Sequence, residues 1–443
     1  MKKHRWHLLA LLLALLLAAV AAGCGGDDED EGEGAATTEE PAAEDVSGSI
    51  SMLALWSGQE ARSIRAVIAG FNERYPDVRV NYRSVPDVRP VLSTAIEGGN
   101  PPDVAALPNP GLMRDFVQRD ALQSIAFARE TIAENYGQSW LDLASVDGTL
   151  YGVFFKGANK STVWYNVHAF EDAGLGDNLP ETWEDFLAAA QTLNESGVPA
   201  YAIGAADGWV LTDLFENIYL RTAGEEMYDQ LTNHEIPWTH ASVKTALREM
   251  AKVIGDTENI AGGRSRSLQL DFEGSVAQVF RSPPQAGMVI EGDFVPGVGT
   301  EATGAKPQTD FNFFDFPSIN DSPPVVMGGG DLVVMFDDNP AARAFIEYLA
   351  TPEAAEIWVR RGGFSSPNKS VDENAYPDPI LRESATALAQ AETFRFDLSD
   401  LTPSAFGGDA MFTVLQDFMQ NPDNIDGIAQ RLEAEAKKAY AGQ

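Results

Sequence analysis

Acidic and aromatic side chains that lie beside glycine are the groups in this sequence best suited to chemistry. Trp209 follows Gly208, and Asp213 comes four residues later, on the same side of any helix that begins there. Asp331 follows three consecutive glycines, which let the backbone approach another molecule closely. Aromatic rings offer flat apolar faces, and carboxylates accept hydrogens from several hydroxyl groups. This combination favours noncovalent binding of a small polar ligand.

Paired carboxylates raise a second possibility, because two carboxylates that flank a glycosidic bond can hydrolyse it. Glu60 and Asp331 would be such a pair, but 66 acidic residues supply many pairs by chance. The sequence contains no motif of serine hydrolases, zinc peptidases, P-loop proteins or dinucleotide-binding enzymes. We therefore expect no catalytic residues, and hydrolysis stays a remote alternative.

Metal and thiol chemistry are limited by one cysteine and five histidines. An intramolecular disulfide or a cysteine-based metal site cannot form. Two histidines lie in the first seven residues, and His168, His234 and His240 do not have the spacing of metal ligands. We expect no metal site and no cofactor.

Charge and length bound the class of protein. The chain has 31 basic and 66 acidic residues, a formal charge of −35, which repels phosphate backbones and argues against a nucleic-acid partner. Its 443 residues, 44% of them hydrophobic, are enough for two to three domains with real cores.

The N-terminal residues have the layout of an export signal. Basic residues precede an apolar run over 8–20, which is too short to span a bilayer comfortably, and small residues lead into Cys24. This layout resembles the lipobox of bacterial lipoproteins, although Ala21 stands where leucine is commonest. We expect a signal peptide over 1–23, acylation of Cys24, and a disordered acidic tether over 24–46.

The remaining sequence alternates strand and helix patterns. Strands are predicted at 49–56, 78–82 and 103–107, with helical periodicity before Pro76 and over 88–96. This order, with its short connections, predicts an α/β domain with a mostly parallel sheet.

The pattern resumes after residue 147, and the C-terminal part is nearly all helical. Thr182 before Trp183 and Thr351 before Pro352 are predicted helix N-caps. No linker divides the body, so two domains would have to share several chain crossings.

Several ordered segments carry a resemblance that covers roughly residues 48–440. They are 71–80 (FNERYPDVRV), 99–104 (GNPPDV), 147–152 (DGTLYG), 164–166 (WYN) and 180–186 (PETWEDF). Together they resemble the extracellular solute-binding proteins that feed sugar ABC importers, the maltose-binding type. The stretches 208–213 (GWVLTD) and 328–331 (GGGD) resemble the lipoproteins of this family assigned to α-glucosides.

The resemblance implies an α/β fold of the periplasmic-binding-protein type II, with two lobes, a cleft between them and crossing hinge strands. Lobe 1 would comprise 47–158 and 317–364, and lobe 2 would comprise 159–316 and 365–443. Ligand would bind between the lobes, at the C-terminal ends of strands.

The resemblance also implies which residues contact a carbohydrate, and each has a structural alternative. Trp56 could instead close a core, Asp103 could brace its loop and Asp213 could cap a helix; Phe294 departs from the tryptophan usual at its position. The expected ligand-binding residues are Trp56, Gln59, Glu60, Asp103, Lys156, Trp209, Asp213, Asp293, Phe294, Asp331, Phe364 and Phe406.

The function implied is that of a lipid-anchored substrate-binding component of an ABC importer. It would capture an oligosaccharide or α-glucoside and deliver it to separate permease subunits, acting as a monomer on the outer face of the cytoplasmic membrane. Two alternatives stay open. One is a two-lobed receptor for a non-sugar ligand such as a polyamine or peptide, and the other is a cell-surface glycoside hydrolase.

Overall fold

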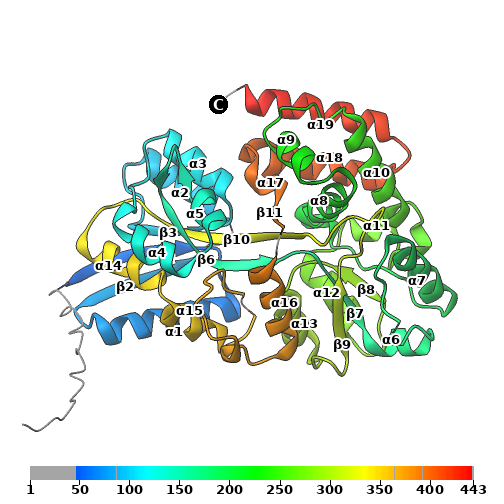
Figure 1. The fold of residues 1–443 in the computed structure, drawn as a ribbon, viewed down its shortest axis with the longest axis horizontal. Coiled ribbons are helices and arrows are strands. Elements are labelled where there is room, and N and C mark those ends of the chain that lie inside the picture. The colour runs from blue at the N-terminus through cyan, green and yellow to red at the C-terminus, as the bar shows by residue number, and fades with distance from the viewer. Residues whose placement is uncertain (1–45, 86, 177, 364, 392, 442–443) are drawn as a thin grey trace, which may run out of the picture. The chain divides into compact units, whose positions relative to one another are not determined.

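The computed structural model describes residues 46–443 except 86, 177, 364, 392, 442 and 443 (Figure 1). The predicted signal peptide, Cys24 and the tether up to residue 45 lie outside the described residues, as does Phe364. No helix in the described part of the chain combines the length and the apolar character needed to cross a membrane.

The first sheet is mixed in direction. Strands β1, β2 and β3 are parallel, whereas β10 is antiparallel to β3 and to β6, and β11 runs parallel to β10. The strands are β1 (Gly48–Ala54), β2 (Val78–Ser84), β3 (Val104–Leu107), β6 (Gly152–Asn159), β10 (Val326–Met335) and β11 (Phe394–Phe396). The parallel part agrees with the sequence pattern.

The second sheet has three strands, and all its pairings are antiparallel. Strand β7 (Thr162–Asn166) lies between β8 (Met288–Ile290) and β9 (Phe311–Asp315). The parallel sheet predicted over 49–107 is the first sheet; no strand direction was predicted for the second, because burial periodicity reveals an interior strand but not the direction of its partner. A hairpin of β4 (Ser145–Val146) and β5 (Thr149–Leu150) precedes the first crossing.

Helices cover both sheets (Figure 1). Before the first crossing they are α1 (Gly58–Arg74), α2 (Val88–Glu97), α3 (Pro110–Gln118), α4 (Arg129–Asn135) and α5 (Gln138–Leu143). Those between the crossings are α6 (Val167–Asp172), α7 (Trp183–Glu195), α8 (Trp209–Ala223), α9 (Glu225–Thr232), α10 (Ala241–Ile254), α11 (Arg264–Ser267), α12 (Phe272–Phe280) and α13 (Val295–Thr303). After β10 come α14 (Pro340–Leu349), α15 (Pro352–Val359), α16 (Pro379–Gln390), α17 (Leu398–Leu401), α18 (Met411–Gln420) and α19 (Ile425–Tyr440).

Local side-chain chemistry sets several helix starts. The hydroxyl Oγ1 of Thr182 accepts a hydrogen bond from the Asp185 backbone at 3.2 Å, and that of Thr351 accepts one from the Ala354 backbone at 3.3 Å. Both predicted N-caps are confirmed. Each satisfies an amide that the first turn of a helix leaves without a partner.

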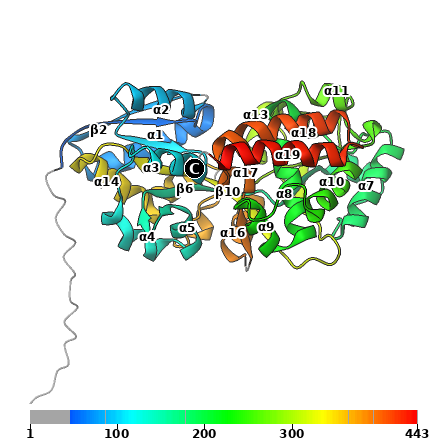
Figure 2. The same cartoon turned by 90° about the horizontal axis from the view of Figure 1, so that it is seen from above.

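Two hydrophobic cores are packed around these sheets, which is the two-lobed α/β arrangement expected. Trp56, Phe71 and Phe154 belong to the first core, and Trp164 and Trp238 belong to the second. Figure 2 shows β6 and β10 between the helices of the two cores.

The chain changes core within the crossing strands. On β10, Met327 packs in the second core and Leu332 in the first, while Ile380 and Leu381 of α16 divide in the same way. The lobe limits drawn from the sequence stay a prediction, and Lys156 lies where β6 leaves the first core.

Candidate functional site

Lys156 on β6 organises the first of two charged clusters at the crossing. It pairs with Asp331 of β10 in the strand register, and its ammonium lies 3.9 Å from the Asp331 carboxylate. It also hydrogen-bonds Glu60, in the first turn of α1. The two carboxylates come from separate elements, and the ammonium of Lys156 on the crossing strand β6 pairs with both.

Trp56 is joined to this cluster by a hydrogen bond. Its indole Nε1 donates to Asp331 Oδ2 at 2.6 Å, and its fully buried ring packs edge-on against Trp358 at 5.1 Å. Trp56 is therefore packed as a core tryptophan, which is the structural alternative considered for it. Nearby, the Gln59 amide donates to the Arg361 carbonyl at 3.4 Å.

Lys160, just beyond β6, organises the second cluster. Its ammonium lies 3.1 Å from Asp213 Oδ2, hydrogen-bonds Asp397, and stands 5.6 Å from the centre of the Trp209 ring. Trp209 and Asp213 lie one turn apart on α8, as their spacing predicted. A cation over an aromatic face is attracted by the negative charge of the ring surface.

Three aromatic rings cluster at Trp209, the ring that Lys160 contacts. Trp209 and Phe294 are half-buried, and both pack on Phe272, with ring centres at 5.0 Å and 5.4 Å respectively. The Trp209 and Phe294 rings are themselves 6.0 Å apart and meet edge to face. Phe272 was not predicted as a site residue, because nothing in the local sequence distinguishes it from a core phenylalanine at the start of α12.

Asp293 precedes Phe294 in the chain and ties three segments together. Its carboxylate accepts hydrogen bonds from Ser365 Oγ at 2.6 Å and from Ser384 Oγ at 3.3 Å. Its backbone amide donates to the Asn159 carbonyl at 3.0 Å. Burial raises the pKa of Asp293 to about 6, against the lowering effect of the two serines.

Two further buried carboxylates near Lys160 were missed by sequence reasoning. Glu216 accepts from the backbone amides of Leu398 and Ser399, at 2.7 Å and 3.0 Å, and so caps the short helix α17. Burial raises its pKa to about 8. Glu291 lies beside Asp213, and burial together with that like charge raises its pKa well above the usual range. Only the fold brings these acids together, so no spacing in the sequence could reveal them.

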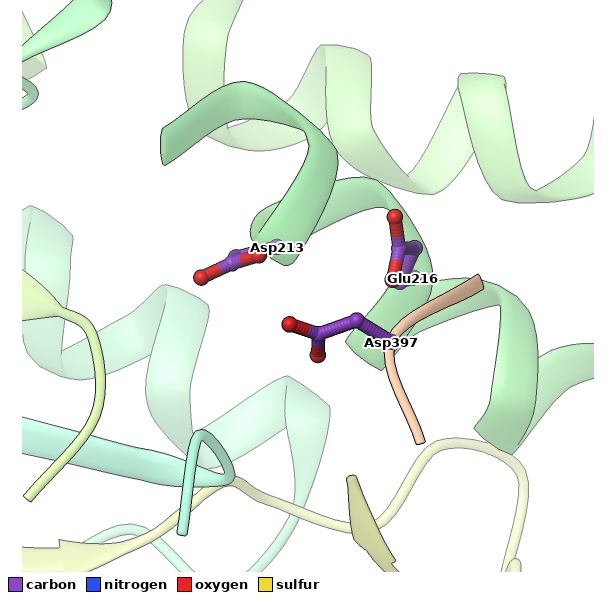
Figure 3. A group of neighbouring side chains, drawn as sticks. All are labelled: Asp213, Glu216 and Asp397. Carbon is purple, nitrogen blue, oxygen red and sulfur yellow. The ribbon is translucent and has the colours of Figure 1, made fainter. Parts of the chain in front are cut away.

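A cation could be held where Asp213, Glu216 and Asp397 converge. One carboxylate oxygen of each lies within 4.8 Å of the others, as Figure 3 shows. The Lys160 ammonium already contacts Asp213 and Asp397, and Glu216 is occupied by the amides of α17. The donor set therefore fits an ammonium better than a metal ion.

Two predicted site residues lie away from the crossing. Asp103 accepts from Ser51 N at 2.8 Å and from Asn339 Nδ2 at 3.0 Å, which is the bracing role considered as its alternative. It lines a cavity of about 730 Å³ beside α2, which contains no other predicted site residue. Phe406 is fully buried and packs on Trp238 at 5.1 Å.

The crossing thus brings together half-buried aromatic faces and carboxylates contributed by both cores. Aromatic faces pack on the apolar side of a ligand, and the carboxylates can accept its hydroxyl hydrogens. The residues gathered there are Gln59, Glu60, Lys156, Trp209, Asp213, Asp293, Phe294 and Asp331, with Trp56 behind them.

Comparison with known proteins places this geometry in a family. Bacterial extracellular solute-binding proteins match the chain over residues 56–356. The alpha-glucosides-binding periplasmic protein AglE of Rhizobium meliloti is 34% identical over 411 residues, which cover 89% of both chains. The osmoprotective compounds-binding protein GgtB of Synechocystis is 34% identical over 381 residues, covering 84% of this chain and 89% of that one.

Solved structures agree in fold. The solute receptor AcbH, described as preferring β-D-galactopyranose, superimposes with a TM-score of 0.78 at 19% identity, covering 89% of this chain and 99% of its own. A chitin oligosaccharide binding protein gives 0.77 at 19% identity, covering 89% and 100%. The family match and the two relatives confirm the resemblance found in the sequence, and the chain belongs to the bacterial extracellular solute-binding proteins, a family of binding proteins.

Proposed function

We propose that this chain is the substrate-binding component of an ABC importer and that its ligand is a carbohydrate, of the α-glucoside class. The observation that carries the proposal is the aromatic surface of Trp209 and Phe294 beside carboxylates from both cores. AglE, by its name, binds α-glucosides, and the long alignment with it supports this class of ligand.

In this proposal Trp209 and Phe294 pack on the apolar face of a sugar ring. Glu60, Asp213 and Asp331 accept hydroxyl hydrogens, and Lys156 donates to a ring or hydroxyl oxygen. A ligand that contacts both cores stabilises the arrangement in which the cores are closest, which is the general basis of ligand-driven domain closure. The closed form would then dock on separate permease subunits.

The location and the assembly state belong to the same proposal. We propose that Cys24 is acylated, that the acidic segment after it tethers a monomeric receptor to the outer face of the cytoplasmic membrane, and that the chain has no enzymatic activity of its own. The test is fractionation of cells that express Cys24→Ala: the wild-type chain should sediment with membranes and the variant should not. Equal sedimentation of the two would contradict the anchor.

Calorimetric titration of the full chain, purified in detergent, tests the ligand. We expect at least one of maltose, trehalose, sucrose and glucose to bind, and Trp209→Ala to weaken that binding at least tenfold, because stacking area is lost. Trp183→Phe is the matched control, since Trp183 is a fully buried tryptophan of the second core outside the crossing. Equal affinity in wild type and Trp209→Ala would contradict the assigned site.

A cationic ligand is the second candidate, and one observation favours it. Asp213, Glu216, Glu291 and Asp397 are all buried around the ammonium of Lys160, and burial raises the pKa of each, which a bound cation would lower again. The same titration with spermidine separates the two candidates. Binding of spermidine and of no sugar would replace the carbohydrate assignment.

A further inference from the structure

We infer that Glu291 is a carboxylic acid rather than a carboxylate, that it donates its proton to Asp213, and that it thereby positions this residue of the proposed ligand site. The inference rests on the proposed function only in that Asp213 is assigned to the site, because the proton itself does not depend on a ligand. Three observations carry it: the contact between the two side chains, the lack of another donor to Glu291 among the described residues, and the excess of acids around Lys160.

The side chains of Glu291 and Asp213 meet in the interior. Glu291 directly follows β8 and is 1% exposed, and Asp213 lies on α8 and is 2% exposed. The two side chains are hydrogen-bonded to each other. Ionised carboxylates carry acceptor atoms alone, so this bond requires a proton on one of the two. Two like charges in such close contact do not both stay ionised, and the pair therefore holds one proton.

The proton belongs on Glu291, because Asp213 has a cationic partner of its own. The ammonium of Lys160 lies 3.2 Å from Oδ1 and 3.1 Å from Oδ2 of Asp213, which stabilises negative charge there. Apart from the contact with Asp213, no donor in the described part of the chain reaches either of the buried carboxyl oxygens of Glu291. A buried group without a partner takes up a proton rather than carry a charge. Burial and the charge of Asp213 accordingly raise the pKa of Glu291 well above its usual range.

The surrounding cluster contains more acids than Lys160 can balance. Asp397 pairs with Lys160, while Glu216 accepts backbone amides at the start of α17 and lies 3.4 Å from the Tyr228 hydroxyl. The titratable groups that face Glu291 and its neighbours are Lys160, Asp213, Glu216, Tyr228, Asp397 and Asp400. A proton on Glu291 removes one negative charge from this set and so lowers the repulsion within it.

The backbone of Glu291 is fixed on β7, so its side chain can act as a support. Its amide donates to the Thr162 carbonyl at 3.3 Å. Its own carbonyl accepts from Thr162 Oγ1 at 2.5 Å and from Trp164 Nε1 at 3.2 Å. One hydrogen bond therefore connects Asp213 on α8 to the second sheet. Loss of the proton would turn this bond into a repulsion between two carboxylates.

Infrared spectroscopy of the full chain at pH 7 tests for the proton, because the C=O stretch of a carboxylic acid lies at higher frequency than amide and carboxylate bands. Glu291→Gln keeps a donor toward Asp213 and removes the acid. We expect Glu291→Gln to lose one carboxylic-acid band of the wild type, and Glu273→Gln, which replaces an exposed glutamate of α12, to keep it. Other buried acids contribute bands to all three chains, so the difference between spectra is measured. Identical carboxylic-acid bands in wild type and Glu291→Gln would overturn the inference and leave the proposed function intact.

Calorimetric titration tests the positioning of Asp213, with whichever of maltose, trehalose, sucrose and glucose binds most tightly. Glu291→Gln should bind as tightly as the wild type, because its amide still donates to Asp213, whereas Glu291→Leu should bind severalfold more weakly. The wild-type affinity should fall as the pH rises and the proton is lost, and that of Glu291→Gln should not. Equal affinity in wild type and a folded Glu291→Leu would overturn the positioning role. Absence of sugar binding by the wild type would overturn the proposed function, while the infrared spectra still decide where the proton lies.

Discussion

At the scale of single residues, the proposed site depends on two largely enclosed lysines, Lys156 and Lys160, whose side chains are 14% and 13% exposed. Burial alone lowers the pKa of a lysine, yet the pKa values of Lys156 and Lys160 are raised, because attraction to Glu60 and Asp331, and to Asp213 and Asp397, outweighs it. Both ammonium groups are therefore charged in the folded protein. Each is a donor with a fixed direction, held by the carboxylates paired with it.

Removal of the Lys160 charge should destabilise the fold. Lys160→Met leaves Asp213 and Asp397 buried without a counter-ion, which costs about 3–5 kcal/mol when one partner of a buried pair is lost. Lys252→Met removes a pair with Glu249 in which the lysine is half exposed, and it should cost no more than about 1 kcal/mol. Urea denaturation of the three chains measures the difference. Equal midpoints for the two variants would show that the Lys160 pairs add nothing.

At the scale of elements, periodicity predicted much of the first sheet and little of the crossing. Strands β1, β2 and β3 and helices α1 and α2 follow from the spacing of apolar residues, because burial on one face leaves a repeat in the sequence. The pairing of β10 with β6 leaves no such signal, since it joins residues about 175 positions apart, such as Asp331 and Lys156.

We expect the free energy of unfolding to depend on pH, because the carboxylate of Asp293 joins the loop after β8 to Ser365 and to Ser384 of α16. An unfolded aspartate has a pKa near 3.9. The folded value is raised to about 6, so this contribution to stability is complete below about pH 4 and is lost as the pH rises to about 6. The shift corresponds to about 3 kcal/mol.

Asp293→Asn removes this titration, and urea denaturation between pH 4 and 7 measures it. The free energy of unfolding of the wild type should fall with rising pH relative to that of Asp293→Asn. Asp310→Asn is the control, since a hydrogen bond from the Lys306 amide lowers the pKa of Asp310, so this group titrates below the measured range and its removal should leave the slope between pH 4 and 7 unchanged. Parallel curves for wild type and Asp293→Asn would contradict the prediction.

At the scale of the whole molecule, the sequence predicted the family and the two-lobed fold through ordered segments. It also indicated most residues of the crossing, because a resemblance preserves their order along the chain. The sequence could not decide whether Trp56 lines the ligand site or packs in a core, because its burial depends on Trp358, far along the chain. The sequence could not identify Glu216 and Glu291 as members of the cluster either, since only the completed fold places them around Lys160.

Lys160 has one further consequence, for changing what this receptor recognises. Its ammonium joins the residue after β6, Asp213 on α8 and Asp397 at the start of α17, so a residue of the proposed site also supports the fold. Libraries built to redirect specificity should vary Trp209 and Phe294, whose rings lie at the partly exposed surface, and keep Lys160 fixed. The same constraint applies to evolution toward a new ligand: Trp209 and Phe294 can be replaced without loss of the fold, whereas Lys160 cannot.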